Sequence, residues 1–561
     1  MSFKLSTCVN NTEEVMNKVL ERIKEYVINF ERISPNKVLI RVDKERLREV
    51  CNYVYNKLNF YYCVGVLSDE RAYTSQYSVY HVFTHDEVNL YIIISSSTPN
   101  LTLPSITREV PPANWSEREA MDLFGVIFED HPDPRRLVKS DDFPEKLYPY
   151  RKDYKYNYRP CGELKKYPFK GYTDVKIIEV SPHHPLFHEH EDFIIYVKND
   201  EVIDIDYRGF YNYRGIEKIG EARLTIDQIP FLAERICGIC GFAHSCAYCQ
   251  AIEETLRIEV SERVYFIRTL MLELERIHSH MLWIGLTLYL TNYVKGFVQI
   301  MRVREEIMNL CEEITGNRKM YGINLIGTVR RDLTLQLVRK IQDILSKVER
   351  EFKDVLTAIP SSVTNRLRGI GILSKENARK LSVVGPTARG SGIKRDVRVN
   401  HPYAAYREVS FNIPTYSEGD VYARFMVRVD EVFESINICR QVLDKLPRGE
   451  VPKEVKYEIV EKSIGIGSTE APRGENIHFV IIGREKKLLR WRVRAPTYAN
   501  LQAIPHMTYG QKIHDVPLII ASIDPCLACT DRAIIIDVKS GKWKSTSMLR
   551  LVKMCMKVNM K

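Results

Sequence analysis

Residues 234–240 read ERICGIC and residues 524–532 read DPCLACTDR, so one C-x-x-C pattern occurs twice, far apart in the chain. A C-x-x-C segment brings two thiolates onto one ion, and thiolates are soft metal ligands. Zinc ribbons keep their two pairs roughly 15–20 residues apart. Pairs separated by a whole domain meet only in a completed fold. The pattern therefore predicts a metal centre built from both ends of one domain, with a non-catalytic zinc scaffold as an alternative.

The length and composition are those of an ordinary globular protein. With 561 residues and 45% hydrophobic content, the chain can form two or three cored domains. Thirteen cysteines, an odd number at low density, favour reduced thiols or metal ligands over a disulfide framework. The N-terminus lacks an apolar signal region, and no segment reaches the roughly 18 apolar residues of a membrane span. We therefore expect a cytoplasmic protein.

The formal net charge of +10 is concentrated at one end of the chain. Residues 533–561 contain seven Lys or Arg against one Asp, which leaves +4 for everything before them. Such a small excess is an ordinary surface balance and does not indicate a nucleic-acid partner.

Hydrophobic periodicity predicts two domains of different character. Helical spacing over 12–32 and strand-like runs such as KVLIRV and NLYIIISSS predict a small α+β domain over 1–147. Residues 148–172, rich in Tyr, Lys, Pro and Gly, are expected to be a linker. The second domain is expected to be mainly an α-helical bundle with peripheral β-structure, which gives an α+β fold class overall. Its predicted elements are a hairpin in DFIIYVKNDEVIDIDYRG, a long helix capped by Ser261, and helices near 297–315, 331–357 and 418–446.

Five other motifs are weaker. Gly369–Ser374 lacks the third glycine of a dinucleotide loop, and Gly385–Gly392 lacks the lysine of a phosphate loop. The E-x-x-H segments Glu275–His278 and Glu475–His478 do not supply the full carboxylate set of a di-iron bundle, so core packing or a local hydrogen bond is preferred for both histidines. The third C-x-x-C, Cys246–Cys249, is interpreted as buried helical thiols.

Longer signatures resemble a known family. ERICGICGFAH resembles the R-x-C-G-x-C-x-x-x-H signature of nickel-iron hydrogenase large subunits, and DPCLACTDR resembles their closing D-P-C-x-x-C. Between them, YRGIEKIGE, ERIHSHMLWIG, SGIKRDVR and GDVYARF are similar to the 49-kDa subunit of respiratory complex I. WSEREAMDLFGVIFEDHPDPRRL is similar to its 30-kDa subunit. This combination resembles the group 4, energy-converting branch, of the formate hydrogenlyase large-subunit type, with its 49-kDa-like domain over 173–532.

The resemblance implies a nickel-iron centre that interconverts dihydrogen with protons and electrons. Cys237 and Cys526 would be terminal nickel ligands, while Cys240 and Cys529 would bridge nickel to an iron that carries carbon monoxide and cyanide. The alternative is a complex I-type NAD(P)H- or ferredoxin:quinone oxidoreductase subunit without such a centre. Quinone-reducing 49-kDa subunits lack these four cysteines, so their presence favours the hydrogenase.

Four further residues follow from the same resemblance. Arg473 of EAPRGENIH would hold its guanidinium over the open metal position, where a fixed charge polarises dihydrogen. Asp524 would hold that arginine. Thr497 of RAPTYANLQ would bond an iron cyanide, and His244 closes the first signature beside the cofactor.

A carboxylate is expected to relay the proton that cleavage places on the sulfur of Cys526. SPHHPLFHEHEDF resembles the branch's G-P-x-H-P-x-x-x-E element, in which the matching glutamate is Glu189. The sequence departs from that element at Ser181, His183 and His190. Because of these departures, Glu191, two residues later, is the alternative match to the glutamate of that element. Glu217 of RGIEK is a second candidate relay, or a ligand for magnesium at an outer site.

Partners are expected because the remaining cysteines form no ferredoxin-like C-x-x-C-x-x-C run. The resemblance implies an iron-sulfur small subunit, a ferredoxin-like iron-sulfur subunit and ion-translocating membrane subunits, with this chain peripheral on the inner, cytoplasmic face of the cell membrane. Related precursors lose a C-terminal extension to a maturation endopeptidase once nickel is inserted. The matching cut follows Arg532 and would remove 533–561, unless AIIIDV is a permanent strand.

Overall fold

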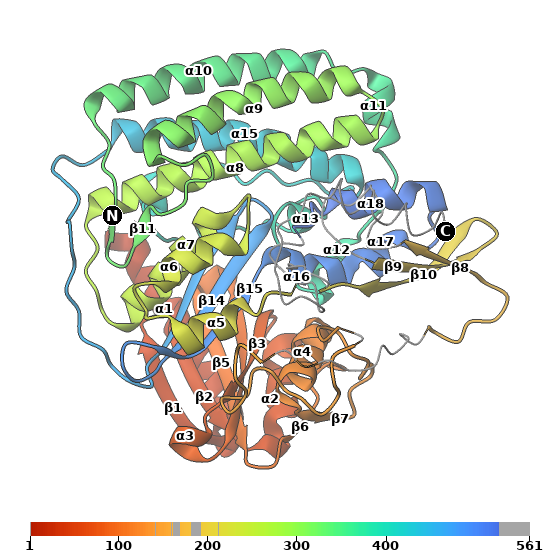
Figure 1. The fold of residues 1–561 in the computed structure, drawn as a ribbon, viewed down its shortest axis with the longest axis vertical. Coiled ribbons are helices and arrows are strands. Elements are labelled where there is room, and N and C mark those ends of the chain that lie inside the picture. Colours follow the sequence, from red (N-terminus) through yellow and green to blue (C-terminus); the bar gives the residue numbers. More distant parts are fainter. Residues whose placement is uncertain are drawn as a thin grey trace, which may run out of the picture.

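The N-terminal part of the chain is built on a five-stranded sheet, seen in a computed structural model that describes residues 2–140, 142–158, 160, 169–180, 192–210 and 213–526 (Figure 1). The strand order is β1-β2-β5-β4-β3, and β2 pairs with β5 in parallel while the other neighbours are antiparallel. The strands are β1 (Val27–Ser34), β2 (Lys37–Val42), β3 (Tyr61–Asp69), β4 (Tyr77–His85) and β5 (Leu90–Thr98).

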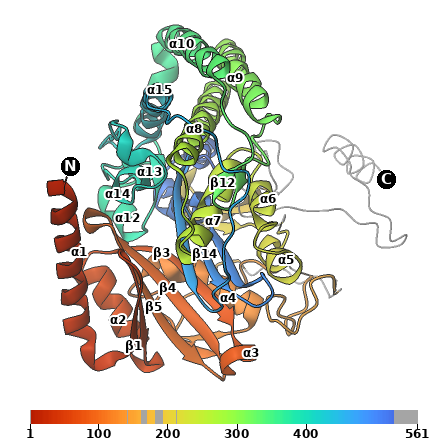
Figure 2. The ribbon, with the colours of Figure 1, turned by 90° about the vertical axis from the view of Figure 1, so that its left-hand side faces the viewer.

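Helices cover one face of this sheet. Figure 2 shows α1 (Ser2–Ile23) and α2 (Leu47–Asn52) on the side away from the rest of the molecule. The expected helix over 12–32 is wrong at its C-terminal end, because α1 stops at Ile23 and residues from Val27 onward form β1. Phe30 pairs with Ile40 of β2. Backbone pairing with a neighbouring strand overrides the local helical spacing of the apolar residues there.

Four long helices form the bundle in the upper part of Figure 1. They are α8 (Glu262–Leu290), α9 (Val294–Thr315), α10 (Leu335–Thr357) and α15 (Val421–Asp444). Helix α8 is central, since it packs against both α9 and α15, and its apolar stripe is buried. The helices predicted from apolar periodicity and the α+β fold class are therefore confirmed. Ser261 occupies the predicted N-cap position of α8, but its side chain makes no capping hydrogen bond.

A three-stranded antiparallel sheet joins the two parts: β13 (Ile464–Ala471), β14 (Gly474–Ile482) and β15 (Leu488–Arg494). Alternate residues of β14 face opposite sides, as in any strand. Ile477, Phe479 and Ile481 share a core with the N-terminal sheet, whereas Val480 and Ile482 share one with α7 (Gly241–Thr255). The central strand therefore contacts both halves of the molecule.

Glycine lets α7 lie very close to β13. A Cβ added at Gly467 would stand 1.8 Å from the carbonyl oxygen of Ala247, and one at Gly465 would stand 2.4 Å from that of Ala251. No side chain fits in such a space. The alternating glycines of IGIGS thus set the distance between the hairpin sheet and the helix that follows the first cysteine pair.

Buried ion pairs also link the N-terminal part to β15. The guanidinium of Arg492 donates to both carboxylate oxygens of Glu119 at 2.6 Å, and Glu119 lies on α4 (Asn114–Phe124). Arg490 and Arg494 donate to the carbonyl oxygens of Leu67 and Cys63 of β3. Arg490, Arg492 and Arg494 are every second residue of β15, so their side chains lie on the same face of the strand, toward the N-terminal part of the chain.

The remaining elements are shorter. The predicted hairpin is confirmed as β9 (Asp192–Lys198) and β10 (Glu201–Arg208), with β8 (Lys176–Val180) beside β9. The other helices and strands are α3 (Arg71–Thr74), β6 (Thr102–Pro104), β7 (Ile127–Glu129), α5 (Ile216–Arg223), α6 (Ile229–Ala233), β11 (Asn324–Leu325), β12 (Thr328–Val329), α11 (Ser361–Arg366), α12 (Lys375–Lys380), α13 (Gly385–Arg389), α14 (Val397–Asn400), α16 (Pro496–Asn500), α17 (Ile504–Thr508) and α18 (Val516–Ser522).

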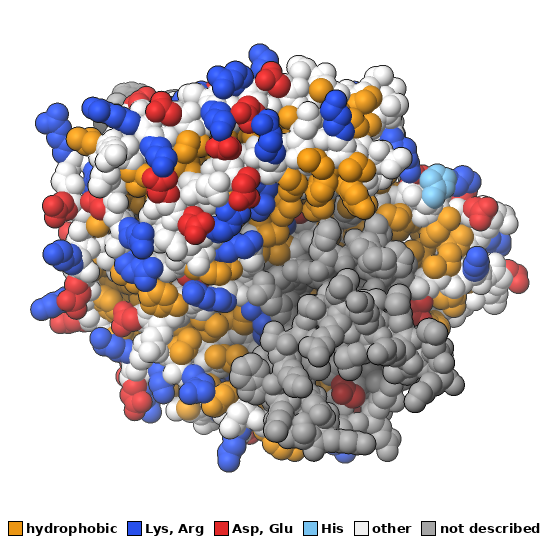
Figure 3. Space-filling view, turned by 45° about the horizontal axis from the view of Figure 1, so that its top comes forward, with side chains coloured by type: hydrophobic (Ala, Val, Ile, Leu, Met, Phe, Trp, Pro, Cys, Tyr) orange, Lys and Arg blue, Asp and Glu red, His pale blue; other side chains and the backbone are white. Residues whose placement is uncertain are grey.

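Two surface properties bear on partners. Within the described residues, no helix combines the length and apolar character needed to cross a membrane. On the face shown in Figure 3, acidic and basic side chains are interspersed over the helical part and are not gathered into one basic area.

Candidate metal centre

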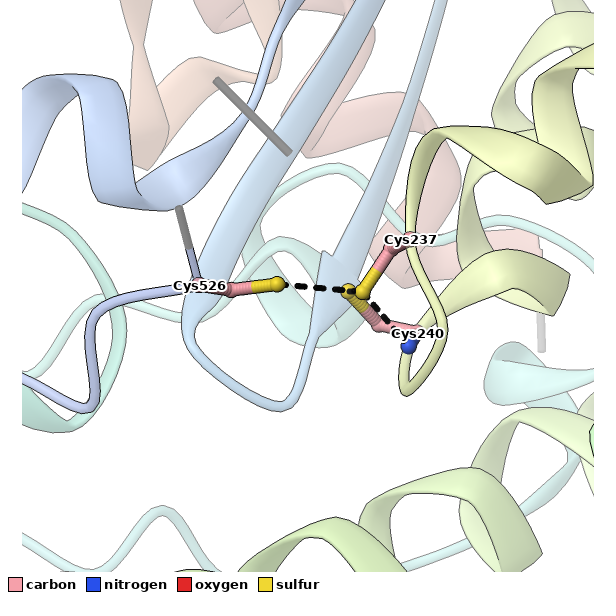
Figure 4. Close-up of side chains that lie close together, drawn as sticks. All are labelled: Cys237, Cys240 and Cys526. Atoms are coloured by element: carbon pink, nitrogen blue, oxygen red, sulfur yellow. Dashed lines mark hydrogen bonds between the residues drawn. The ribbon is translucent and has the colours of Figure 1, made fainter. Parts of the chain in front are cut away.

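Three cysteines from the two ends of the second domain meet in the interior. The sulfur atoms of Cys237, Cys240 and Cys526 all lie within 4.8 Å of one another, and Cys237 Sγ is 3.1 Å from each of the other two (Figure 4). All three residues are buried. Cys529 lies outside the described residues. The pairing of remote cysteines predicted by the sequence is therefore observed for three of the four.

The first pair is held by the turn that leads into α7. Cys240 occupies the N-cap position of that helix, and the backbone N–H groups of Ile239 and Cys240 point to the sulfur of Cys237 at 3.2 and 3.1 Å. Backbone N–H donors stabilise a thiolate as they stabilise any anion. The phenolic hydroxyl of Tyr321 donates to the carbonyl oxygen of Cys237 at 2.9 Å and fixes the turn from outside.

Glu275 holds the start of α7 in place. Its two carboxylate oxygens accept hydrogen bonds from the backbone N–H groups of Phe242 and Ala243 at 2.8 and 3.0 Å. These are among the first-turn donors that a helix leaves unpaired. Burial raises the pKa of Glu275 well above its ordinary value, while the two N–H donors oppose that shift. Its role as a cap supplied by α8 depends on tertiary structure, and no local sequence signal could have shown it.

The second cysteine segment enters from the end of α18. Asp524 has a positive φ of 56°, which turns the chain sharply before Cys526. The hydroxyl oxygen of Thr497 accepts a hydrogen bond from the backbone N–H of Cys526 at 3.1 Å. Thr497 is thus next to the thiol cluster, in direct contact with the backbone of a candidate ligand.

Arg473 lies at the tip of the β13–β14 hairpin. Ala471 pairs with Gly474, so Pro472 and Arg473 form a two-residue turn. A Cβ on Gly474 would stand 2.6 Å from the backbone nitrogen of Gly385, so glycine is needed for the close approach of α13. This turn is buried, unlike an ordinary hairpin turn, and it carries the arginine into the interior.

The guanidinium of Arg473 is fixed by three hydrogen bonds. Nε donates to the carbonyl oxygen of Asp524 at 2.7 Å, Nη2 donates to its carboxylate at 2.8 Å, and Nη1 donates to the hydroxyl of Ser279 at 3.3 Å. Burial alone would lower the pKa of Arg473, but Asp524 and the three thiols hold it well above its ordinary value. The predicted Arg473–Asp524 pair is present in the structure, beside the sulfurs. Ser279 was not predicted, since a serine in a helix gives no signal of its own.

His244 lies one turn after Cys240 on α7 and is fully buried. Burial lowers its pKa to about 4, although the charge of Cys237 opposes this. The ring is therefore neutral at physiological pH. Its Nδ1 is 3.1 Å from Nε2 of His478 on β14.

Glu217 is placed among arginines. Its oxygens accept hydrogen bonds from Arg490 at 2.8 Å, from Arg492 at 3.2 Å and from the backbone N–H of Val493 at 3.0 Å. Binding of magnesium there would have to compete with two guanidinium groups for the same oxygens. The carboxylate also lines a small cavity of about 60 Å³ together with Ile236, the residue before Cys237. Glu189, Glu191 and Arg532 lie outside the described residues.

The donor set fits a redox-active metal centre. Thiolates suit nickel and other soft transition ions, and thiolates buried without a cation would carry a large desolvation penalty. Neutral thiols need no counter-charge, but the same three sulfurs bound as thiolates would need the charge of a metal ion in addition to the one guanidinium of Arg473. Three thiolates would also accept zinc, and the donor set alone does not separate the two metals.

Comparison with known families supports a nickel-iron centre over a zinc site. Residues 214–304 match the family described as nickel-dependent hydrogenase. Residues 40–160 match the 30 Kd subunit of respiratory-chain NADH dehydrogenase, and residues 293–466 and 458–532 match its 49 Kd subunit. A hydrogenase region thus lies between two regions related to complex I.

Individual relatives are subunits of hydrogenases and of respiratory membrane complexes. Hydrogenase-4 component G of Escherichia coli (strain K12) is 38% identical over 96% of this chain and 95% of its own length. Formate hydrogenlyase subunit 5 of the same organism is 38% identical over 91% of this chain and 92% of its own length. A chain in the solved structure of the membrane-bound sulfane sulfur reductase, an archaeal respiratory membrane complex, is 28% identical with a TM-score of 0.61, over 65% of this chain and 100% of that one. The chain therefore belongs to the group 4 nickel-iron hydrogenase large subunits, with fused domains like the 30-kDa and 49-kDa subunits of complex I.

Proposed function

We propose that this chain is the catalytic large subunit of a membrane-associated hydrogenase, with a nickel-iron centre held by Cys237, Cys240, Cys526 and Cys529. The observation that supports this most strongly is the convergence of three buried thiols beside a buried arginine. When bound, the centre, with carbon monoxide and cyanide on its iron, supplies the heterolytic cleavage of dihydrogen. In this proposal Cys237 and Cys526 would be ligands of nickel alone, and Cys240 and Cys529 would be ligands shared by nickel and iron.

The residues around the thiols orient and polarise the substrate. Arg473 holds a positive charge near the sulfurs, and three hydrogen bonds keep its guanidinium plane from rotating. A charge fixed before the reaction needs no reorganisation during it, and it is strong because water is excluded. Asp524 sets the direction of that charge. Thr497 fixes the backbone at Cys526. Its hydroxyl would also donate to a diatomic ligand of the iron.

The proton leaves through a carboxylate. We assign to Glu189 the proton that is first held on the sulfur of Cys526, with Glu217 as a second relay whose oxygens are already bound by arginines. A relay needs an acceptor within hydrogen-bond reach of the sulfur. Electrons would leave to an iron-sulfur small subunit and then to a ferredoxin-like subunit, because this chain has no ferredoxin-like C-x-x-C-x-x-C run of its own.

In this proposal, partner subunits hold the hydrogenase chain at the membrane. Ion-translocating membrane subunits would anchor this chain peripherally on the inner face of the cell membrane, in line with the absence of a spanning helix among the described residues. An endopeptidase would remove 533–561 after metal insertion.

Infrared spectroscopy of the purified protein tests the proposal. Only a hydrogenase centre gives sharp carbonyl and cyanide bands, and metal analysis should find nickel and iron together. A protein that contains zinc and lacks both kinds of band would be a scaffold. A protein without metal that reduces or binds quinone would be a complex I-type subunit, which the match to the 49 Kd family keeps as the second candidate.

A further inference from the structure

Arg428 of α15 is a buried cation with two unused hydrogen-bond donors. Its side chain is fully buried, and its Nη1 donates to the carbonyl oxygen of Arg424 at 2.9 Å. Its Nε and Nη2 make no hydrogen bond within the part of the chain that the structure describes. Burial lowers the pKa of Arg428 only to about 10, so the guanidinium stays charged at neutral pH. Because a buried charge with unused donors is costly, an acceptor is expected close to these two nitrogens.

The carboxylate of Asp524 offers the matching acceptor. Its Oδ1 accepts from Arg473, whereas its Oδ2 is buried and has no hydrogen-bond partner among the described residues. Burial raises the pKa of Asp524, and the charges of Arg473 and then Arg428 oppose that rise. Arg428 is therefore close enough for its charge to act on this carboxylate.

Glu431 is the other carboxylate whose charge acts on Arg428. Its oxygens are already in use, because Oε1 accepts from Arg389 at 2.7 Å and Oε2 lies 2.7 Å from Nε2 of His280. Of these two carboxylates, Asp524 is the one with an oxygen to spare.

Trp283 of α8 connects Arg428 to the segment that carries Asp524. The guanidinium lies over the indole, 4.1 Å from the ring centroid, and the indole Nε1 donates to the carbonyl oxygen of Ala521 in α18 at 2.7 Å. Stacking on an aromatic face restrains the plane of a guanidinium. Arg428 is thus held in one orientation relative to the turn that leads to Cys526.

A single water molecule fits the unused groups of Arg428 and Asp524. No hydrogen bond joins these groups directly. Nε and Nη2 form one edge of the guanidinium, so both can donate to the same oxygen. Buried waters typically make about three hydrogen bonds to polar groups that otherwise lack partners. Two donors of Arg428 and one oxygen of Asp524 are such a set.

We propose that Arg428 is a positioning residue, linked through one buried water to Oδ2 of Asp524. Asp524 is then held by two guanidiniums, that of Arg473 at Oδ1 and that of Arg428 at Oδ2, and its carboxylate cannot rotate away from Arg473. The water bridge rests only on side chains of this protein. Its effect on turnover rests on the nickel-iron centre proposed above, because it acts through the direction of the Arg473 charge.

The first test is a crystal structure of the metal-free, full-length chain at a resolution that shows ordered water. We expect one water within hydrogen-bond distance of Nε and Nη2 of Arg428 and of Oδ2 of Asp524. In Arg428→Met, which fills a similar space without the donors, the carboxylate of Asp524 should turn and lengthen its bond to Arg473. An Nε–Nη2 edge bound to any other acceptor, or unchanged geometry at Asp524 in Arg428→Met, would overturn the proposal.

The second test measures hydrogen evolution per bound nickel. Arg428→Met should keep its nickel but lower turnover by a factor on the order of ten, and Arg428→Lys, which keeps the charge, should recover part of the loss. In an Arg473→Lys background, Arg428→Met should have little further effect, because residues that act through one another are not additive.

Arg268→Met is the matched control. Arg268 is equally buried, but it is paired with Glu253, near the end of α7 opposite to the thiols, at 2.8 and 2.6 Å. Its variant should keep its turnover per nickel. Equal losses in Arg428→Met and Arg268→Met, or losses that add to that of Arg473→Lys, would reject the role in turnover.

If Arg428→Met does not fold, Arg428→Lys carries both tests, since a single ammonium keeps the buried charge but cannot hold the water from two nitrogens. Absence of nickel from the unaltered chain would reject the proposed function, whereas the crystal structure of the metal-free chain decides the water bridge separately.

Discussion

Replacing Arg473 by lysine keeps a positive charge beside the thiolates but removes the planar fork that holds it. In the structure the fork donates from Nε to the carbonyl oxygen of Asp524 at 2.7 Å and from Nη2 to its carboxylate at 2.8 Å. A third bond reaches Ser279. A lysine ammonium is a single point donor on a flexible stem, so it cannot restore this geometry.

The size of the effect follows from the lost hydrogen bonds. Bonds that involve a charged group contribute about 1.5–3 kcal/mol each, and lysine would forfeit at least one of them. If that free energy is expressed in the transition state, the loss of one bond should lower turnover by a factor on the order of 10–10², at about 1.36 kcal/mol for each factor of ten. Nickel content should stay unchanged, because the arginine is not a ligand.

Hydrogen evolution per bound nickel, with a reduced viologen dye as electron donor, is the assay. Arg263→Lys is the matched control. Arg263 also uses its whole fork, on Asp332 and on the carbonyl oxygens of Leu333 and Pro447, but it lies at the start of α8, outside the thiol site. Its variant should keep its turnover per nickel. Turnover of Arg473→Lys within about threefold of the unaltered chain, under about 1 kcal/mol of activation free energy, would refute the role of a fixed charge.

Three further predictions concern the ligands, the proton and the tail. Cys237→Ser should lose nickel and all turnover, because a hydroxyl is a poor ligand for a soft metal, whereas Cys246→Ser should keep both; full activity in the first variant would refute the site. Glu189→Gln should keep its metals but lose turnover by a factor on the order of 10²–10⁴, and Glu191→Gln should change little. If kinetic assays give the reverse result, Glu191 is the proton relay and the alignment of this segment shifts by two residues. Intact-mass measurement on protein from a nickel-replete host should show a chain ending at Arg532, whose net charge would fall from +10 to +4; an active, nickel-loaded chain of full length would contradict the proposed cleavage.

Much of the fold could be predicted from local patterns. The apolar stripes of α8, α9, α10 and α15 repeat with the helical period, and the alternating residues of β9 and β10 repeat with the strand period. The prediction failed near β1, where helical spacing continues past Ile23 although the backbone pairs with β2. A strand partner is a non-local influence, and periodicity within one segment does not report it.

For the candidate site as well, the sequence predicted some of the residues and only the tertiary structure revealed the others. The repeated C-x-x-C is a short pattern of chemically specific residues, so the sequence by itself determined the cysteines as candidate ligands. Arg473 and Asp524 became candidates because the A-P-R-G and D-P-C segments resemble those of a known family. Only the tertiary structure decided that Glu275 caps α7 and that Ser279 contacts Arg473. It alone brought His478 and Trp491 into line with His244. Hydrogen bonds between remote segments depend on the path of the whole chain through space, and that path is set by the packing of helices and sheets and not by neighbours in the sequence.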